Sequence, residues 1–317
     1  MALSLCASSV ENTGGLACDK SRGVGKKIFI FNGSIAAADY DTEAELFAKL
    51  VANSKLSKSD AEKVFVVNEI QDIQDKSEAN TEASFNLGLK SIIREGRPAY
   101  EFKVEAGSDM LKRLRKFNNQ TVRIIEWDAN DTAWFTKVGT DAKGFKAKLF
   151  FSGNKLASGQ NIEEGFVTVT VSILSVSEYF DGAYWADLSD YNVEDIVALV
   201  DVALAYVSNS SNVHKISMKI AGSQLSGPYS IGPDYGTTIA TLDTDFSAKS
   251  GAGTPSTALA ITSVAYDSTL DALTVTYDNT AYGTATGNLL LNGPTPAQLD
   301  GADVTGIELI SVTYAKP

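Results

Sequence analysis

Residues 165–177 read GFVTVTVSILSVS, and this stretch decides the class of fold. Valine, isoleucine and leucine alternate with threonine and serine, so an extended chain has one apolar and one polar face. β-Branched residues lose side-chain freedom in a helix and pack well on a pleated surface. The stretch therefore predicts a long central strand, buried on at least one face, in a chain that is mainly β.

Comparable alternation on the N-terminal side of this stretch predicts further antiparallel strands. The expected strands are residues 27–32, 64–75, 80–93, 98–104, 121–127, a short one near Trp134 and Phe135, and 145–151. Residues 94–97 (REGR) contain a glycine typical of a tight turn, so 80–93 and 98–104 are expected to pair as a hairpin. Together these strands predict an antiparallel β-barrel or sandwich.

Two short helices are expected within this first part. Thr42 followed by Glu45 fits a capping box, and the apolar residues after it have helical spacing, which predicts a helix over 43–53. Apolar residues from Met110 to Phe117 are interleaved with lysine and arginine, which predicts a second helix over 109–117. The overall class is therefore mainly β, of the α+β kind.

The C-terminal part has shorter strands separated by turn residues. Residues 201–207 and 213–220 predict one hairpin, and residues 261–266 and 273–277 predict another. A loop-rich stretch is expected over 222–255, and the chain is expected to close with a strand over 307–314. This pattern indicates a β-sandwich with immunoglobulin-like architecture, although the cysteine–tryptophan–cysteine core of true immunoglobulins is absent.

Charge divides the chain into two parts. Residues 186–317 contain four lysines, no arginine and fourteen acidic residues, whereas all six arginines and all three tryptophans precede them. A length of 317 residues also suggests about two domains. We therefore expect an N-terminal arm at 1–26, a β domain at 27–185 and an acidic β-sandwich at 190–317, which should be soluble and repel nucleic acid.

The sequence shows no pattern of a membrane span or secretory signal, and it contains only two cysteines. No apolar run approaches the roughly 20 residues that span a bilayer, and residues 1–15 lack the basic and apolar regions of a secretory signal. No membrane partner is expected. Cys6 and Cys18 are favoured as free thiols in a reducing cytoplasm, with pairing across an N-terminal loop as the alternative.

Residues that could perform catalysis or bind metal are sparse, and no catalytic, cofactor or metal site is expected. The single histidine, His214, begins an expected strand and is interpreted as a surface residue of an edge strand, because no second histidine or nearby cysteine would complete a zinc site. Carboxylate pairs are interpreted as solvated turns, with weak calcium binding as the alternative. These pairs are Asp39/Asp41, Asp128/Asp131, Glu163/Glu164 and Asp243/Asp245.

Three other features could bind ligands but favour structural interpretations. Residues 22–27 (RGVGKK) lack the full phosphate-loop pattern and are interpreted as a flexible turn of the arm. The basic cluster is interpreted as a solvated helix face or a contact to an acidic neighbour; it comprises Lys112, Arg113, Arg115 and Lys116. Aromatic residues near strand ends are expected to be core or interface anchors rather than sugar platforms; these are Trp127, Trp134, Tyr184 and Trp185.

The expected arm, the antiparallel strands over 64–104 and the helix 109–117 followed by strand 121–127 resemble the tail tube proteins of long-tailed bacteriophages. The C-terminal domain resembles immunoglobulin-like decorations on phage tail proteins. The resemblance implies a non-enzymatic virion protein, assembled in the bacterial host cytoplasm, whose copies form stacked rings around passing DNA. It implies contacts with copies of itself and with other tail or head proteins, and at most non-specific contact with DNA.

Two other functions are compatible with the same sequence. A capsid decoration or head-fibre protein would dock through residues 1–185 and display the acidic domain. A carbohydrate-binding adhesin would use the C-terminal domain, where eight of the twelve tyrosines lie.

Overall fold

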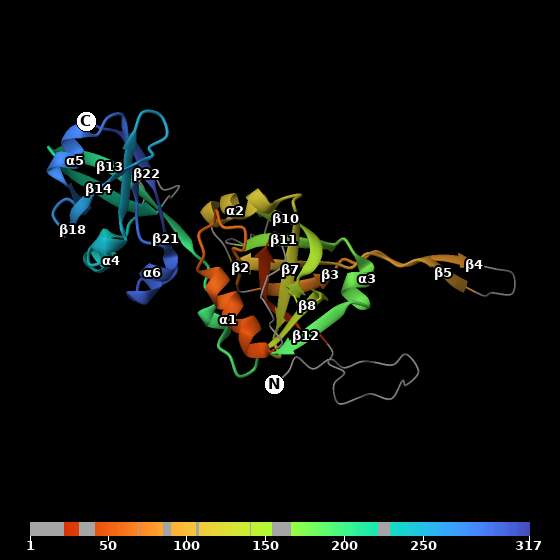
Figure 1. Ribbon diagram of the computed structural model, residues 1–317. Coiled ribbons are helices and arrows are strands. Elements are labelled where there is room, and N and C mark those ends of the chain that lie inside the picture. Colours follow the sequence, from red (N-terminus) through yellow and green to blue (C-terminus); the bar gives the residue numbers. More distant parts are fainter. Residues whose placement is uncertain are drawn as a thin grey trace, which may run out of the picture. The chain divides into compact units, whose positions relative to one another are not determined.

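The computed structural model describes residues 22–31, 42–68, 70–84, 90–105, 108–139, 141–153, 166–220 and 229–317. The chain divides into two compact units, the first within residues 1–54 and 58–198 and the second within residues 55–57 and 199–317. The expected domain boundary at 185–190 lies just before this division. Both units consist mainly of antiparallel strands with a few short helices, which confirms the predicted fold class (Figure 1).

The first unit contains twelve strands and three α-helices among the described residues. The strands are β1 (Gly25–Phe31), β2 (Phe65–Val67), β3 (Ile70–Asp75), β4 (Thr81–Ser84), β5 (Lys90–Arg94), β6 (Ala99–Glu105), β7 (Thr121–Asp128), β8 (Thr132–Val138), β9 (Asp141–Lys143), β10 (Phe145–Gly153), β11 (Phe166–Ile173) and β12 (Ala183–Asp187). The helices are α1 (Glu43–Ser54), α2 (Ser108–Leu114) and α3 (Val176–Phe180), with 3-10 turns at Arg115–Phe117 and Val193–Asp195.

The strand pairings of the first unit close into a barrel. β7 pairs with β10, β10 with β11, β11 with β6 and β6 with β3. β1 pairs with β7 on one side and with β2 on the other, and β2 precedes β3 in the chain. Because β2 and β3 belong to one short segment, this segment joins the two ends of the sheet. Closure of this kind leaves fewer exposed sheet edges, although the branch formed by β8, β9 and β12 lies outside the closed part.

The stretch that predicted a central strand forms β11, which lies between β10 and β6. Its alternate residues Val167, Val169, Val171 and Ile173 are buried in the barrel interior. The strand ends at Ile173 rather than continuing to 177. The hydroxyl of Ser175 accepts a hydrogen bond from the Glu178 amide at 3.3 Å and so caps helix α3, which the alternation had concealed.

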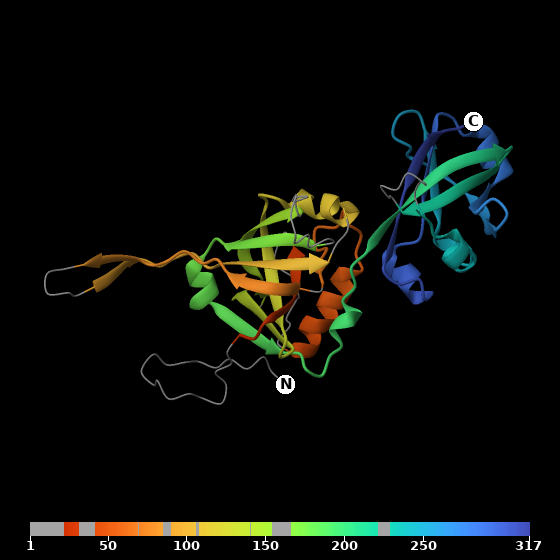
Figure 2. The ribbon, with the colours of Figure 1, turned by 180° about the vertical axis from the view of Figure 1, so that it is seen from behind.

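β1 and β7 are buried on both faces. Ile28 and Ile30 belong to the barrel interior, whereas Phe29 and Phe31 belong to a second core that includes Leu46 and Leu50 of α1. Helix α1 lies beside the barrel (Figure 2), and the Thr42 hydroxyl accepts a hydrogen bond from the Glu45 amide at 3.3 Å. The predicted helix 43–53 is confirmed, and the predicted helix 109–117 appears as α2 followed by a 3-10 turn.

The prediction of one strand over residues 64–75 is wrong. β2 pairs with β1, and β3 pairs with β6 through an irregular register between Gln71 and Gln74. Asp72 has a positive φ of 51°, which bends the backbone at this point. A uniform alternation in the sequence therefore became two strands with different partners.

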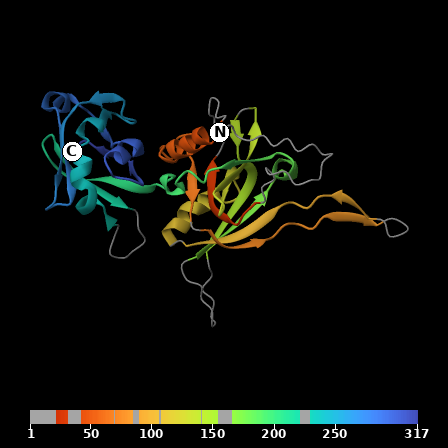
Figure 3. The ribbon, with the colours of Figure 1, turned by 90° about the horizontal axis from the view of Figure 1, so that it is seen from below.

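The prediction of one strand over 80–93 is also wrong, as is its pairing with 98–104. β4 and β5 pair with each other, and β6 pairs with β3 and β11. Backbone hydrogen bonds from Lys76 to Ala99 at 2.9 Å and from Glu78 to Arg97 at 3.0 Å extend the β3–β6 ladder toward β4 and β5. The result is a two-stranded ribbon that leaves the barrel (orange, Figure 3).

Among its described residues, the second unit contains ten strands and three short α-helices. The strands are β13 (Val200–Ser210), β14 (Val213–Ile220), β15 (Tyr229–Ser230), β16 (Ser247–Gly251), β17 (Thr257–Leu259), β18 (Ile261–Asp267), β19 (Ala272–Tyr277), β20 (Asn288–Asn292), β21 (Ile307–Ile310) and β22 (Val312–Ala315). The helices are α4 (Gly232–Ala240), α5 (Asn279–Thr284) and α6 (Pro296–Gly301), with a 3-10 turn at Asp243–Asp245.

Two sheets form the sandwich of the second unit and share one hydrophobic core. One has the order β18-β19-β14-β13-β21, with β15 paired to β14, and the other has the order β17-β16-β20-β22. Both predicted hairpins are confirmed, including the pairing of Val202 with Ile220 and of Leu204 with Met218. The predicted final strand is divided, because β21 pairs in parallel with β13 while β22 pairs with β20.

Candidate functional site

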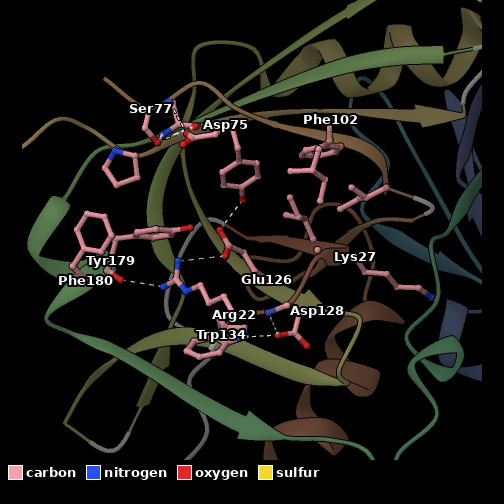
Figure 4. A pocket seen from close by; sticks show the side chains of 18 residues that line it. Arg22, Lys27, Asp75, Ser77, Phe102, Glu126, Asp128, Trp134, Tyr179 and Phe180 are labelled. Atoms are coloured by element: carbon pink, nitrogen blue, oxygen red, sulfur yellow. Dashed lines mark hydrogen bonds and ion pairs between the residues drawn. The ribbon is translucent and has the colours of Figure 1, made fainter. Parts of the chain in front are cut away.

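A cavity of about 390 Å³ lies at one mouth of the barrel (Figure 4). Residues of β1, β3, β6, β7, β8 and α3 line it, so strands distant in the sequence supply its walls. Most of the wall is apolar, with Ile28, Ile73 and Phe102 among the lining residues. Phe180 at the end of α3 is 61% exposed beside this cavity.

The polar side of this cavity is organised around Glu126 of β7. The Tyr100 hydroxyl donates a hydrogen bond to its carboxylate at 2.7 Å, and the Arg22 guanidinium lies 3.8 Å from the other carboxylate oxygen (Figure 4). Burial raises the pKa of Glu126, while the charge of Arg22 opposes that rise. Burial and the neighbouring carboxylate raise the pKa of Tyr100 well above its usual value. The site therefore contains a buried carboxylate held by a phenol and a guanidinium.

Arg22 reaches this site from the segment that was expected to be a flexible turn of the arm. Its guanidinium lies 3.7 Å from the ring centroid of Tyr179 and donates a hydrogen bond to the Tyr179 carbonyl at 3.0 Å. Strand β1 begins at Gly25, two residues before the expected start at 27, and the flexible-turn interpretation does not hold for Arg22. Residues 1–21, with Cys6 and Cys18, lie outside the described residues.

The predicted carboxylate pair Asp128/Asp131 forms a structural corner rather than a solvated turn. Asp128 is 2% exposed and accepts hydrogen bonds from the Trp134 indole at 2.9 Å and the Gly23 amide at 2.8 Å. Asp131 accepts from the Trp127 indole at 3.2 Å and has a positive φ of 54°. Both carboxylates therefore fix the β7–β8 turn against buried tryptophans.

The ribbon of β4 and β5 presents an exposed apolar surface. Ile92 is 55% exposed and Ile93 is 69% exposed. Both isoleucines lie on β5 where the ladder is irregular, since Glu82 pairs with Ile92 and Thr81 pairs with Arg94, which leaves Ile93 as an extra residue between them. Gly96 allows the two chains to approach closely at the base of the ribbon, because a Cβ there would lie 1.8 Å from the Glu78 carbonyl oxygen.

The interpretation of His214 as a surface residue of an edge strand is wrong. Its strand β14 is central, paired with β13 and β19, and the side chain is fully buried. Nε2 lies 3.0 Å from the Tyr282 hydroxyl and Nδ1 lies 3.0 Å from the Tyr314 hydroxyl. Tyr206 and Tyr277 also pack against the ring. We call these four tyrosines and His214 the tyrosine cluster.

The tyrosine cluster should make the second unit sensitive to acid. Burial, aided by the charge of Lys316, lowers the pKa of His214 below its ordinary value of 6.5. As the pH falls, His214 therefore takes up a proton in the unfolded chain before it does so in the folded chain. The free energy of unfolding then decreases as the pH drops below the pKa of the unfolded state. Between about pH 7.5 and about pH 5, the wild type should lose more thermal stability than His214→Gln, measured by near-ultraviolet circular dichroism of tyrosine. Equal losses in the two proteins would contradict this expectation.

The remaining sequence candidates have structural positions. Trp127 and Trp134 are buried core residues, whereas Tyr184 and Trp185 lie half-buried on β12. The basic cluster lies on α2 and the following 3-10 turn, with Lys112, Arg115 and Lys116 exposed. Asp243 and Asp245 lie in a 3-10 turn where Gln298 donates to Asp245 at 2.7 Å. Asp39, Asp41, Glu163 and Glu164 lie outside the described residues.

Within the described ranges, no group of three or more histidine, cysteine, aspartate or glutamate side chains could hold a metal ion. Among the described residues, every helix is too short or too polar to cross a lipid bilayer. Sequence reasoning missed the group formed by Arg22, Tyr100, Glu126 and Tyr179, because its members come from separate elements without a motif-like spacing. No known family model matches the sequence, and a search of curated proteins likewise gives no match.

Proposed function

We propose that this chain is a structural protein of a bacteriophage virion whose copies assemble into stacked rings, forming the tail tube through which DNA passes. The observation that carries the proposal is the ribbon of β4 and β5, whose surface exposes Ile92 and Ile93. An isolated two-stranded ribbon is marginally stable in water. Contact with a second copy would bury both isoleucines and support the ribbon.

Strand β12 gives further support for association between copies. Among the described residues, β12 pairs only with β8, so one of its backbone edges has no strand partner. Tyr184 and Trp185 lie half-buried on this strand, and aromatic side chains are frequent anchors of protein interfaces. An edge of this kind is suited to a neighbouring subunit.

The charge distribution is compatible with a conduit for DNA. Residues 1–185 contain 23 basic and 25 acidic residues, so their net charge is nearly balanced. Dense lysine and arginine would hold the phosphate backbone and slow its passage. The second unit is acidic and would repel DNA. We propose that it is an immunoglobulin-like domain that decorates the outer surface of the assembly.

The test is negative-stain electron microscopy of the purified full-length chain, with light scattering to give the oligomer mass. Rings or tubes are the expected result at high protein concentration. A strictly monomeric species at every concentration would count against the proposal. Monomers that bind empty capsids would instead indicate a decoration or head-fibre protein.

The tyrosine cluster does not favour the carbohydrate-binding alternative. Tyr206, Tyr277, Tyr282 and Tyr314 pack around His214, and a sugar platform requires exposed aromatic faces. Tyr229 is 62% exposed on the short strand β15 and does not belong to this cluster. Binding to a glycan array that is lost on deleting residues 199–317 would reverse this preference.

A further inference from the structure

Arg22 occupies a cage of three aromatic rings. Its guanidinium carbon lies 3.7 Å from the ring centroid of Tyr179, 4.9 Å from that of Phe145 and 5.2 Å from that of Trp134. The negative faces of aromatic rings attract cations at such distances, most strongly where water is excluded. The side chain of Arg22 is only 25% exposed, so much of this attraction is shielded from solvent.

The rim of the cage has hydrogen-bond acceptors on two sides of the guanidinium. One terminal nitrogen donates to the Tyr179 carbonyl at 3.0 Å, and the other lies 3.8 Å from the Glu126 carboxylate. Glu126 is itself oriented by the Tyr100 hydroxyl at 2.7 Å. A buried carboxylate without a cation is unfavourable, so a positive group beside Glu126 stabilises the folded chain.

The walls of the cage are held by contacts that do not involve Arg22. The Trp134 indole donates to Asp128 at 2.9 Å, and Phe145 is fully buried and meets the Tyr179 ring edge-on at 5.0 Å between centroids. The cage therefore should persist when the Arg22 side chain is removed. The cavity of about 390 Å³ adjoins the cage, because Trp134, Tyr179 and Glu126 also line it, which gives a small cation a route of entry (Figure 4).

We propose that this barrel mouth is a guanidinium-binding site, filled in the native chain by Arg22 and able to bind free alkylguanidinium ions when that side chain is absent. The site prefers guanidinium to ammonium, because a planar group stacks on Tyr179 while its separate nitrogens reach the carbonyl and the carboxylate. An ammonium ion has no plane to stack and is more strongly hydrated. This inference is independent of the proposed assembly.

The test compares thermal unfolding of the full chain carrying Arg22→Ala in ethylguanidinium and in ethylammonium at equal ionic strength, at concentrations too low to denature. Ethylguanidinium should raise the midpoint of the variant by about 2–4 °C relative to ethylammonium. The wild type, whose cage is filled, should show no such difference. In the double variant Arg22→Ala/Glu126→Gln the selective rise should be lost or much reduced.

Equal responses of Arg22→Ala to the two cations would overturn the proposal, as would an equal selective rise in the wild type. If Arg22→Ala does not yield folded protein, Arg22→Lys serves as the second variant, since it keeps the charge and the apolar stem. Its midpoint should lie below that of the wild type. A midpoint equal to that of the wild type would show that charge alone suffices and would also overturn the proposal.

Discussion

Replacing Ile92 and Ile93 together by threonine is expected to abolish the assembly of rings or tubes while the chain remains folded as a monomer. Both side chains are more than half exposed, so the barrel core does not depend on them. Threonine is also β-branched and keeps the strand preference. It replaces apolar atoms of the isoleucine side chain with a hydroxyl, so a second copy would find less apolar surface to cover. Electron microscopy and light scattering measure the outcome.

The matched control replaces Val207 and Leu270 by threonine. These residues are 54% and 56% exposed and lie in the second unit, so the control removes comparable apolar surface elsewhere on the chain. It should assemble as the wild type does. Assembly by the Ile92/Ile93 variant at wild-type concentrations would exclude the ribbon as the contact between copies.

Trp127→Ala is expected to cause the largest loss of stability in the first unit, about 3–5 kcal/mol in the free energy of unfolding. Trp127 is fully buried between the barrel and α1, with its ring edge-on to Phe29 at 6.0 Å and near Phe47 at 6.5 Å. Its indole also holds Asp131 at 3.2 Å. The substitution would leave a large cavity and remove the indole donor of Asp131, which among the described residues keeps only its ion pair with Lys26 at 3.7 Å.

Urea denaturation followed by the fluorescence of the remaining tryptophans measures this loss, because all three tryptophans lie in the first unit. Trp185→Ala is the matched control, since Trp185 is half-buried on β12. The control should lose substantially less stability. Equal losses in the two variants would contradict the expectation that the buried Trp127 contributes more to the free energy of unfolding than the half-buried Trp185.

The hairpin of β13 and β14 illustrates what sequence pattern predicts well. The alternation over residues 201–207 and 213–220 predicts that these segments pair, and in the structure Val202 pairs with Ile220 and Leu204 with Met218. The two strands are adjacent in the chain and joined by a two-residue turn in which Ser211 has a positive φ of 56°. Local alternation together with a short turn predicts such a pairing, while an irregularity between Tyr206 and Ser208 shifts the register by one residue.

The ribbon shows where the same reasoning fails. The sequence predicts Gly96 as a turn residue, but it marks a close approach to the Glu78 carbonyl at the base of the ribbon. Alternation records which face a side chain occupies and carries no information about which strand lies alongside. The reversal between β4 and β5 therefore escaped detection, and the β6 strand was assigned to the wrong partner.

Helix α6 was missed although a local signal was present. Thr295 accepts from the Gln298 amide at 3.4 Å while Gln298 accepts from the Thr295 amide at 2.7 Å, and Pro296 begins the helix. This is a capping box, recognisable from the sequence. The cage around Arg22 had no comparable signal, because its rings come from β8, β10 and α3.

The sequence by itself determined the mainly β class, the helix beginning after Thr42 and the local hairpins of the second unit, because these depend on side-chain periodicity and nearby turns. Tertiary structure alone decided that the segment of β2 and β3 closes the barrel, that His214 lies in a central strand and that Arg22 meets Glu126. Each of these outcomes depends on pairing between distant segments. Such pairing is set by the packing of the whole core, which no short window of sequence contains.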